Sequence, residues 1–320
     1  MRVSSDTGRR VCGFVAILLC TAVILDCGGS VATDEDTSKY IEEIKSWHQQ
    51  RIERLKDPKG WLSLAGLHWL EEGENTLGTG SSNDIVLPDG KAPALVGVIT
   101  LNDGVITINV EAGIQVVHEK RPIQSTTMYH DQDPDHETTV LELGPLSWYA
   151  VKRGGRLGIR VKDSESNRLK QFRGIETYEI DPRWRVEGIL EPHDPPKMVS
   201  ITNVLGVESK EPSPGTLVFE IDGTTHKLDP IAEPGDDELF VVFGDRTNGK
   251  ETYGGGRFVY VDAPGEDGKI VVDFNKAYNP PCALTPYATC PLPPPQNQLP
   301  IAVRAGEKVY GNPAHKKTGH

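Results

Sequence analysis

The segment from Asp273 to Asn297, DFNKAYNPPCALTPYATCPLPPPQN, constrains the fold of this chain more than any other. Eight of the 24 prolines of the sequence lie between Pro280 and Pro300. Each proline fixes φ and removes a backbone hydrogen-bond donor, so this proline-rich loop cannot form a helix or a central strand. We therefore expect a fixed, irregular loop, and loops of this kind often carry function.

Residues 1–27 have the layout of an export signal. The basic stretch MRVSSDTGRR precedes about fifteen apolar residues, as in secretory signals. Cys27 follows Leu25-Asp26 and precedes Gly28, which resembles the lipobox of bacterial lipoproteins, although Asp26 stands where a small residue is expected. The sequence predicts an exported protein of the cell envelope. Lipidation of Cys27, cleavage without lipidation and an uncleaved membrane anchor remain alternatives.

The charge of the chain limits its partners. The sequence has 34 Lys and Arg against 46 Asp and Glu, a formal net charge of -12 at pH 7. Such a charge repels nucleic acid and anionic lipid headgroups. We expect no nucleic-acid partner, and membrane association only through the N-terminal signal or a lipid. We expect a monomer, and no sequence motif points to a cofactor or a metal.

The cysteines divide into two groups. Cys12, Cys20 and Cys27 lie in the predicted export signal, which leaves only Cys282 and Cys290 for the folded part. Two thiols close in sequence, in a chain that leaves the cytoplasm, favour a disulfide. Closing this short loop would stabilise the fold by about 2.5 kcal/mol in the chain-entropy model. If both thiols were free, a metal site or a cysteine nucleophile would become the better interpretation.

The periodicity of apolar residues predicts one helix followed by many strands. Apolar residues recur at helical spacing from about Thr37 to Lys56, and Pro58 follows. We expect this helix to pack on a sheet. Asn102-Asp103-Gly104 predicts a tight hairpin. Short β-branched runs predict strands at 95–101, 104–110, 138–143, 146–153, 157–163, 216–221, 225–231, 238–243, 256–262 and 269–274.

These elements predict a mainly β fold in two halves. Residues 28–36 form a tether, and residues 37–190 comprise the helix and a β-sandwich-like half. Residues 191–320 form a second β-rich half with the proline-rich C-terminal loop, and the prolines at 192–196 mark the boundary. The sequence shows no alternation of strands and helices, which argues against Rossmann folds and TIM barrels.

The first half resembles a forkhead-associated β-sandwich. Gly73 to Pro88, GENTLGTGSSNDIVLP, is similar to the opening of that fold, in which a glycine turn precedes a phosphopeptide-binding loop. The phosphate-binding arginine of the family should follow Gly78, and Thr79 stands there instead. The resemblance therefore implies the architecture without phosphothreonine binding.

Polar side chains gather at the ends of the predicted C-terminal strands. Asp273 closes one strand, Asn275 and Tyr278 follow it, and Arg257 begins the preceding strand. In a hairpin Arg257 would lie near the same end. A guanidinium that faces carboxylates and amides makes a good clamp for a polar ligand. The candidate ligand-binding residues are Asp245, Thr247, Tyr253, Arg257, Asp273, Asn275, Tyr278, Asn279, Asn297 and Glu307.

Three functions remain open for these residues. The first is binding of a small polar or anionic ligand, with Arg257 as its charge partner. The second is a hydrolase in which Asp273 or Glu307 acts as general base and Arg257 stabilises developing negative charge. The third is a structural or envelope-interaction protein without a pocket, in which the same side chains satisfy the backbone groups of an irregular loop.

Several strings of the sequence are specific enough to compare with a known family. They are Asp245–Tyr253, Gly256–Phe258, Asp273–Cys282, Cys290–Pro294, Asn297–Leu299 and Ala305–Lys308. Together these strings resemble the bacterial and archaeal domain of unknown function numbered 1684. Gly60–Leu70 and Gly158–Asp163 fit the same family, so that the resemblance extends from Trp47 to Lys308. It implies no chemistry, because the family has no assigned activity.

Overall fold

The computed structural model of the chain describes residues 34–265 and 267–311. The predicted export signal with Cys27 lies outside these residues. The described part is mainly β, as the sequence predicts, with a long N-terminal helix α1 (Asp34–Leu55) and a short helix α2 (Asn167–Gln171). Within residues 34–265 and 267–311, no helix combines the length and the apolar character needed to span a membrane.

Two sheets form a sandwich over residues 64–163, which we call the N-terminal sandwich. Its strands are β1 (Leu64–Trp69), β2 (Gly73–Gly78), β3 (Ile85–Val86), β4 (Gly97–Asn102), β5 (Val105–Val110), β6 (Val116–His118), β7 (Arg121–Ile123), β8 (Ser125–Thr127), β9 (Val140–Leu143), β10 (Leu146–Arg153) and β11 (Arg156–Asp163). One sheet has the order β1-β11-β10-β9-β6-β7, and the other has the order β3-β2-β4-β5-β8.

Alternate residues of both sheets share one core. Trp148 and Ala150 of β10 pack in the same apolar cluster as Ile106 and Ile108 of β5, and all four are almost fully buried. Successive side chains of a strand point to opposite faces, so this alternation directs one face of each sheet inward. The structure confirms the predicted β-sandwich of the first half.

The predicted hairpin forms between β4 and β5. Asn102 pairs with Val105, which leaves Asp103 and Gly104 as the two residues of the turn. Their φ angles are 47° and 82°, and a type I′ turn requires a positive φ at both positions.

The second β-rich half, which we call the C-terminal half, contains a four-stranded sheet and a separate hairpin. Its strands are β12 (Arg185–Thr202), β13 (Glu208–Ile221), β14 (Thr224–Leu228), β15 (Glu238–Phe243), β16 (Arg257–Asp262) and β17 (Lys269–Asp273). The sheet has the order β14-β13-β12-β17, and β15 pairs with β16. Phe219, Val241, Val259, Val272 and Phe274 belong to their common core.

The division between the halves differs from the predicted boundary at residue 191. The prolines at 192–196 lie inside β12, where the pairing with β13 shifts between Pro192 and Lys197. Because a proline cannot donate to a β-ladder, such an irregularity is the place where a strand tolerates it. The C-terminal half therefore already includes Arg185, the first residue of β12.

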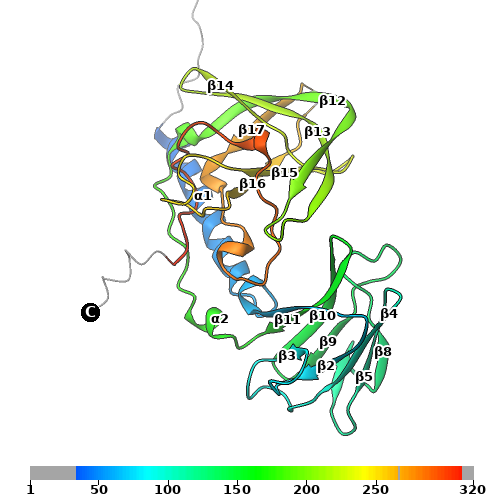
Figure 1. Ribbon diagram of the computed structural model, residues 1–320. Coiled ribbons are helices and arrows are strands. Elements are labelled where there is room, and N and C mark those ends of the chain that lie inside the picture. Colours follow the sequence, from blue (N-terminus) through cyan, green and yellow to red (C-terminus); the bar gives the residue numbers. More distant parts are fainter. Residues whose placement is uncertain (1–33, 266, 312–320) are drawn as a thin grey trace, which may run out of the picture.

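Helix α1 packs on the C-terminal half, although the predicted division grouped it with the sandwich. Figure 1 shows α1 running along the C-terminal half, with the N-terminal sandwich beyond its C-terminal end. The Tyr40 hydroxyl donates to Asp273, and Arg51 forms an ion pair with Glu307. Side-chain contacts with residues far along the sequence therefore decide where the helix lies.

The proline-rich loop, residues 273–297, is irregular as predicted and forms part of the contact between the halves. It contains the 3-10 turns η3 (Phe274–Lys276), η4 (Pro281–Ala283) and η5 (Pro295–Asn297). Arg153 and Arg160 of the sandwich both donate to the Thr289 hydroxyl. Leu64 of β1 packs against Ala288. The loop thus joins the sandwich to the C-terminal half.

Candidate functional site

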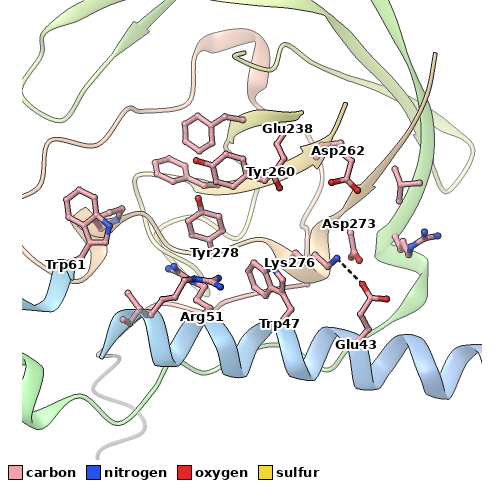
Figure 2. A pocket seen from close by; sticks show the side chains of 18 of the residues that line it. Glu43, Trp47, Arg51, Trp61, Glu238, Tyr260, Asp262, Asp273, Lys276 and Tyr278 are labelled. Atoms are coloured by element: carbon pink, nitrogen blue, oxygen red, sulfur yellow. Dashed lines mark hydrogen bonds and ion pairs between the residues drawn. The ribbon is translucent and has the colours of Figure 1, made fainter. Parts of the chain in front are cut away.

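A cavity of about 820 Å³ lies between α1 and the strands β15, β16 and β17 (Figure 2). Six aromatic side chains line it: Trp47, Trp61, Phe240, Phe258, Tyr260 and Tyr278. Charged side chains of both signs also line it: Arg51, Arg54, Arg185, Lys276, Glu43, Glu238, Asp262 and Asp273. The cavity thus combines an aromatic surface with charged groups of opposite sign.

The strand register explains the wall on the β side. On β16, Phe258, Tyr260 and Asp262 are two residues apart and therefore share one face. Their partners on β15 include Phe240, opposite Tyr260, and Glu238, opposite Asp262. Figure 2 shows Glu238, Tyr260 and Asp262 on the side of the cavity away from α1.

The helical repeat explains the opposite wall. Glu43, Trp47, Arg51 and Leu55 follow one another at intervals of four residues, so they lie on one face of α1. Figure 2 shows Glu43, Trp47 and Arg51 directed from the helix toward the cavity. This mixed polar and aromatic stripe was not predicted from the sequence. The four-residue spacing was the signal that could have revealed it.

Arg51 connects the helix to the C-terminal segment. Its Nε lies 2.5 Å from Oε1 of Glu307, and a second guanidinium nitrogen donates to the carbonyl of Asn279 at 2.9 Å. The guanidinium carbon lies 4.3 Å from the ring centroid of Tyr278. The other carboxylate oxygen of Glu307 accepts from the backbone N–H of Asn279 at 2.7 Å. Glu307 therefore has both oxygens occupied, and it does not line the cavity.

Asp273 is the carboxylate that combines burial with a place in the cavity wall. The Tyr40 hydroxyl lies 2.9 Å from both carboxylate oxygens, and the Asn275 backbone N–H donates at 3.0 Å. Burial raises the pKa of Asp273 above its usual value, although the hydrogen bonds from Tyr40 and Asn275 oppose the shift. Burial, followed by the charge of Asp273, also raises the pKa of Tyr40, so Tyr40 remains a donor.

Tyr278 brings the proline-rich loop into the cavity wall. Its backbone pairs with Phe258 of β16 in an isolated antiparallel bridge. The Tyr278 ring lies parallel to the Tyr260 ring, with 6.3 Å between centroids, and edge-on to the Phe258 ring. Burial raises the pKa of Tyr278, and the neighbouring Tyr260 raises it further. The phenol therefore stays protonated near neutral pH.

Arg257, the predicted charge partner of a ligand, does not line the cavity. Its side chain is fully buried and donates to Oδ2 of Asp245 at 2.8 Å. It also donates to the backbone carbonyls of Val303, at 2.7 Å, and Ala305. The predicted ligand-binding role of Arg257 is thus corrected to a structural one, because these internal acceptors hold the guanidinium inside the protein. We call Arg257 with its acceptors on Asp245, Val303 and Ala305 the Arg257 clasp.

Most of the other candidate residues also hold backbone in place. Of the ten predicted ligand-binding residues, Asp273 and Tyr278 line the cavity. Asp245 accepts from Thr247, and the Asn297 amide donates to the carbonyls of Asp229 and Val242. The side chains of Asn275 and Asn279 donate to the carbonyls of Asp181 and Lys308. Tyr253 is half-buried and outside the cavity wall.

Cys282 and Cys290 lie next to each other as free thiols, so the structure does not confirm the predicted disulfide. The backbone N–H of each donates to the sulfur of the other at 3.1 Å. The hydrogen bond from Cys290 lowers the pKa of Cys282 against the effect of burial, and Arg160 adds to the lowering. The same pairing, together with burial, raises the pKa of Cys290.

Within residues 34–265 and 267–311, no group of three or more His, Cys, Asp or Glu side chains is arranged to hold a metal ion.

A protein family described as "Protein of unknown function (DUF1684)" matches residues 170–308 of this chain. This span contains the C-terminal strings that resemble the family. The two other strings that fit it, Gly60–Leu70 and Gly158–Asp163, lie outside the match. No curated protein is similar enough to count as a match.

Several solved structures are similar to parts of the chain. The solution structure of an uncharacterized protein of Haloarcula marismortui is 34% identical, with a TM-score of 0.37, and the match covers 43% of this chain and 78% of that one. A forkhead-associated domain of a Chlamydia trachomatis protein is 20% identical, with a TM-score of 0.21 over 31% of this chain and 95% of that one. The FhaA forkhead-associated domain, solved with the intracellular domain of another protein, is 19% identical, with a TM-score of 0.21 over 30% and 86%.

Replacing Arg257 should destabilise the protein strongly. We expect Arg257→Ala to lower the free energy of unfolding by about 3–5 kcal/mol, because it leaves the Asp245 carboxylate buried without its partner. Arg304→Ala is the control. It removes an ion pair with Glu251 at the surface, and such exposed pairs contribute little to stability. Urea unfolding of both variants measures the difference, and equal losses would contradict the assignment of Arg257 as a clasp.

The two thiols should pair when the protein is made in an oxidising compartment. Their proximity and the lowered pKa of Cys282 favour disulfide formation. We expect alkylation of the denatured protein, mapped by mass spectrometry, to label neither Cys282 nor Cys290 until reductant is added. In Cys282→Ser, Cys290 should be labelled without reductant. Labelling of both cysteines in the unreduced wild-type chain would refute the disulfide.

Proposed function

The chain belongs, over residues 170–308, to the DUF1684 family of unknown function, and we propose from its geometry that it binds a small polar ligand. The binding site is the cavity between α1 and the strands β15–β17. The observation that supports this proposal is the composition of the wall, which joins six aromatic rings to charged groups of both signs in one space. Ligand sites typically pair an apolar, aromatic lining with a few polar groups.

The size of the cavity also favours a small molecule. Its volume of about 820 Å³ lies within the range of about 300–1,000 Å³ that is usual for ligand pockets. The polar groups that line the cavity differ from those predicted from the sequence. Arg257 and Asn279 do not line it, whereas four charged residues that were not predicted do: Arg54, Arg185, Glu238 and Asp262. A purely structural or envelope-interaction protein would need no such cavity, so the binding function is favoured over it.

A hydrolase is the second candidate function, and the observation that favours it is the state of Asp273. A carboxylate with a raised pKa at the wall of a cavity can act as a general base. Glu307, the alternative base, is less suitable because it does not line the cavity and forms an ion pair with Arg51. Arg51 lines the same cavity, so it takes the role predicted for Arg257, the stabilisation of developing negative charge.

We further propose that the protein acts in the cell envelope. The support is the sequence of residues 1–27, with its basic start, its apolar run and Cys27. The acidic charge of the chain repels anionic headgroups, so the N-terminal signal or a lipid on Cys27 would hold it at the membrane.

A ligand should be found by thermal-shift screening of the full chain with amino acids, sugars, nucleosides and organic acids. We expect Arg54→Ala and Glu238→Ala each to weaken its binding by about tenfold, since a hydrogen bond to a charged group contributes about 1.5 kcal/mol or more. Lys250→Ala and Glu220→Ala remove exposed charges outside the cavity and should leave the affinity unchanged. A ligand that binds both cavity variants with unchanged affinity binds elsewhere on the protein. If no ligand is found, the result counts against the proposal.

The hydrolase alternative makes a separate prediction about pH. The full chain is assayed with nitrophenyl esters, phosphates and glycosides as test substrates. A base must be deprotonated to act, so the rate should rise with pH through a midpoint above 3.8, the ordinary value for Asp, because the pKa of Asp273 is raised. Asp273→Asn should abolish the activity, whereas Asp267→Asn, an exposed carboxylate outside the cavity, should keep it. Full activity in Asp273→Asn would exclude this role.

Lipidation of Cys27 is tested in a bacterial host grown with labelled palmitate. We expect the full chain to carry the label in the membrane fraction and Cys27→Ser to lose it. A label that persists in Cys27→Ser would show attachment elsewhere. An unlabelled chain that is shortened at its N-terminus would instead indicate cleavage without lipidation, and an unlabelled chain of full mass would indicate a membrane anchor.

A further inference from the structure

The cavity contains the exposed aromatic side chains of the described structure. Trp61 is 42% exposed and Tyr260 is 49% exposed, and both line the cavity. All other Phe, Tyr and Trp residues within 34–265 and 267–311 are buried or half-buried. Burial of large aromatic surfaces is strongly favourable. Two exposed rings in one cavity therefore indicate a surface that a bound molecule covers.

The cavity also contains charges that have no ion-pair partner among the described residues. Arg51 pairs with Glu307, and Lys276 pairs with Glu43 at 3.2 Å. Asp273 is held by Tyr40. The exposed charges left without an ion pair are Arg54, Arg185, Glu238 and Asp262.

These four charges sum to zero, so they favour a ligand without net charge. A guanidinium offers parallel donors, and a carboxylate offers two acceptor oxygens. Together they suit a molecule that carries hydroxyl groups side by side, each able to donate and accept. The net charge of -12 on the whole chain repels polyanionic molecules at long range. The electrostatics thus disfavour an acidic ligand.

We propose that the cavity binds a neutral oligosaccharide, an inference that rests on the proposed ligand-binding function. A sugar ring has an apolar face of C–H groups that can cover an aromatic ring such as Tyr260 or Trp61. Its hydroxyl groups lie around the edge of the ring, where charged side chains such as Arg54 and Asp262 can bind them.

The aromatic rings and the volume separate this ligand from other neutral molecules. A free amino acid could satisfy one positive and one negative side chain, but it would leave an aromatic ring uncovered. The rings of Trp61 and Tyr260 come from different elements, η1 (Trp61–Ser63) and β16. Figure 2 shows Trp61 at one end of the view and Tyr260 near its centre. Together with a volume of about 820 Å³, this arrangement fits several linked sugar units better than one.

The test titrates the full chain with maltotriose, cellotriose, laminaritriose and N-acetylated chitotriose, measured by calorimetry and tryptophan fluorescence. We expect saturable binding of at least one trisaccharide. Trp61→Ala and Tyr260→Ala should each weaken it about threefold to tenfold, the usual range for loss of an aromatic contact. Tyr260→Phe should retain the affinity because it keeps the ring. Ile189→Ala and Met198→Ala remove exposed apolar side chains outside the cavity and should change nothing.

The possible outcomes separate this inference from the proposed function. Trisaccharide binding that both aromatic variants weaken supports the inference. Binding that neither variant changes overturns it. If no trisaccharide binds but another polar ligand does, with loss of affinity in Arg54→Ala, the inference is overturned and the proposed function stands. If no polar ligand of any class binds, both are overturned.

Discussion

The buried guanidinium of Arg257 is the interaction on which the C-terminal half depends. It joins β16 to the turn at Asp245 and to the carbonyls of Val303 and Ala305. A buried charge without partners would cost several kcal/mol, so these acceptors fix the course of residues 303–305. Glu307, two residues further along, binds Arg51 of α1. The clasp therefore positions the helix that forms one wall of the cavity.

The proline-rich loop links this clasp to the rest of the molecule. Thr289 accepts hydrogen bonds from Arg153 and Arg160 of the N-terminal sandwich, and Tyr278 enters the cavity wall. The prolines of the loop remove backbone donors, and the Asn297 side chain donates to the carbonyls of Asp229 and Val242 beside it. One loop thus contacts the sandwich and contributes to the cavity, which explains why a rigid segment is needed there.

Regular strands could be predicted from the sequence where side-chain alternation is clear. The predictions for β10 and β15 match the observed bounds, and those for β16 and β17 are within one residue. Strand β2 was missed because GENTLG carries a single large apolar residue, and β12 because its prolines resemble a boundary. In both cases pairing with neighbouring strands outweighs the weak local preference.

Local sequence is enough to predict that the chain is mainly β, that one helix precedes the strands and that residues 273–297 form an irregular loop, because periodicity and proline chemistry act locally. Which polar groups face a cavity depends on the packing of distant segments. Arg257 begins β16 and Asp273 ends β17, the next strand in the sequence, yet Arg257 is enclosed by carbonyls and Asp273 lines the cavity. The cavity itself needs α1 beside strands about two hundred residues later, and a contact over that distance depends on packing that local sequence does not specify.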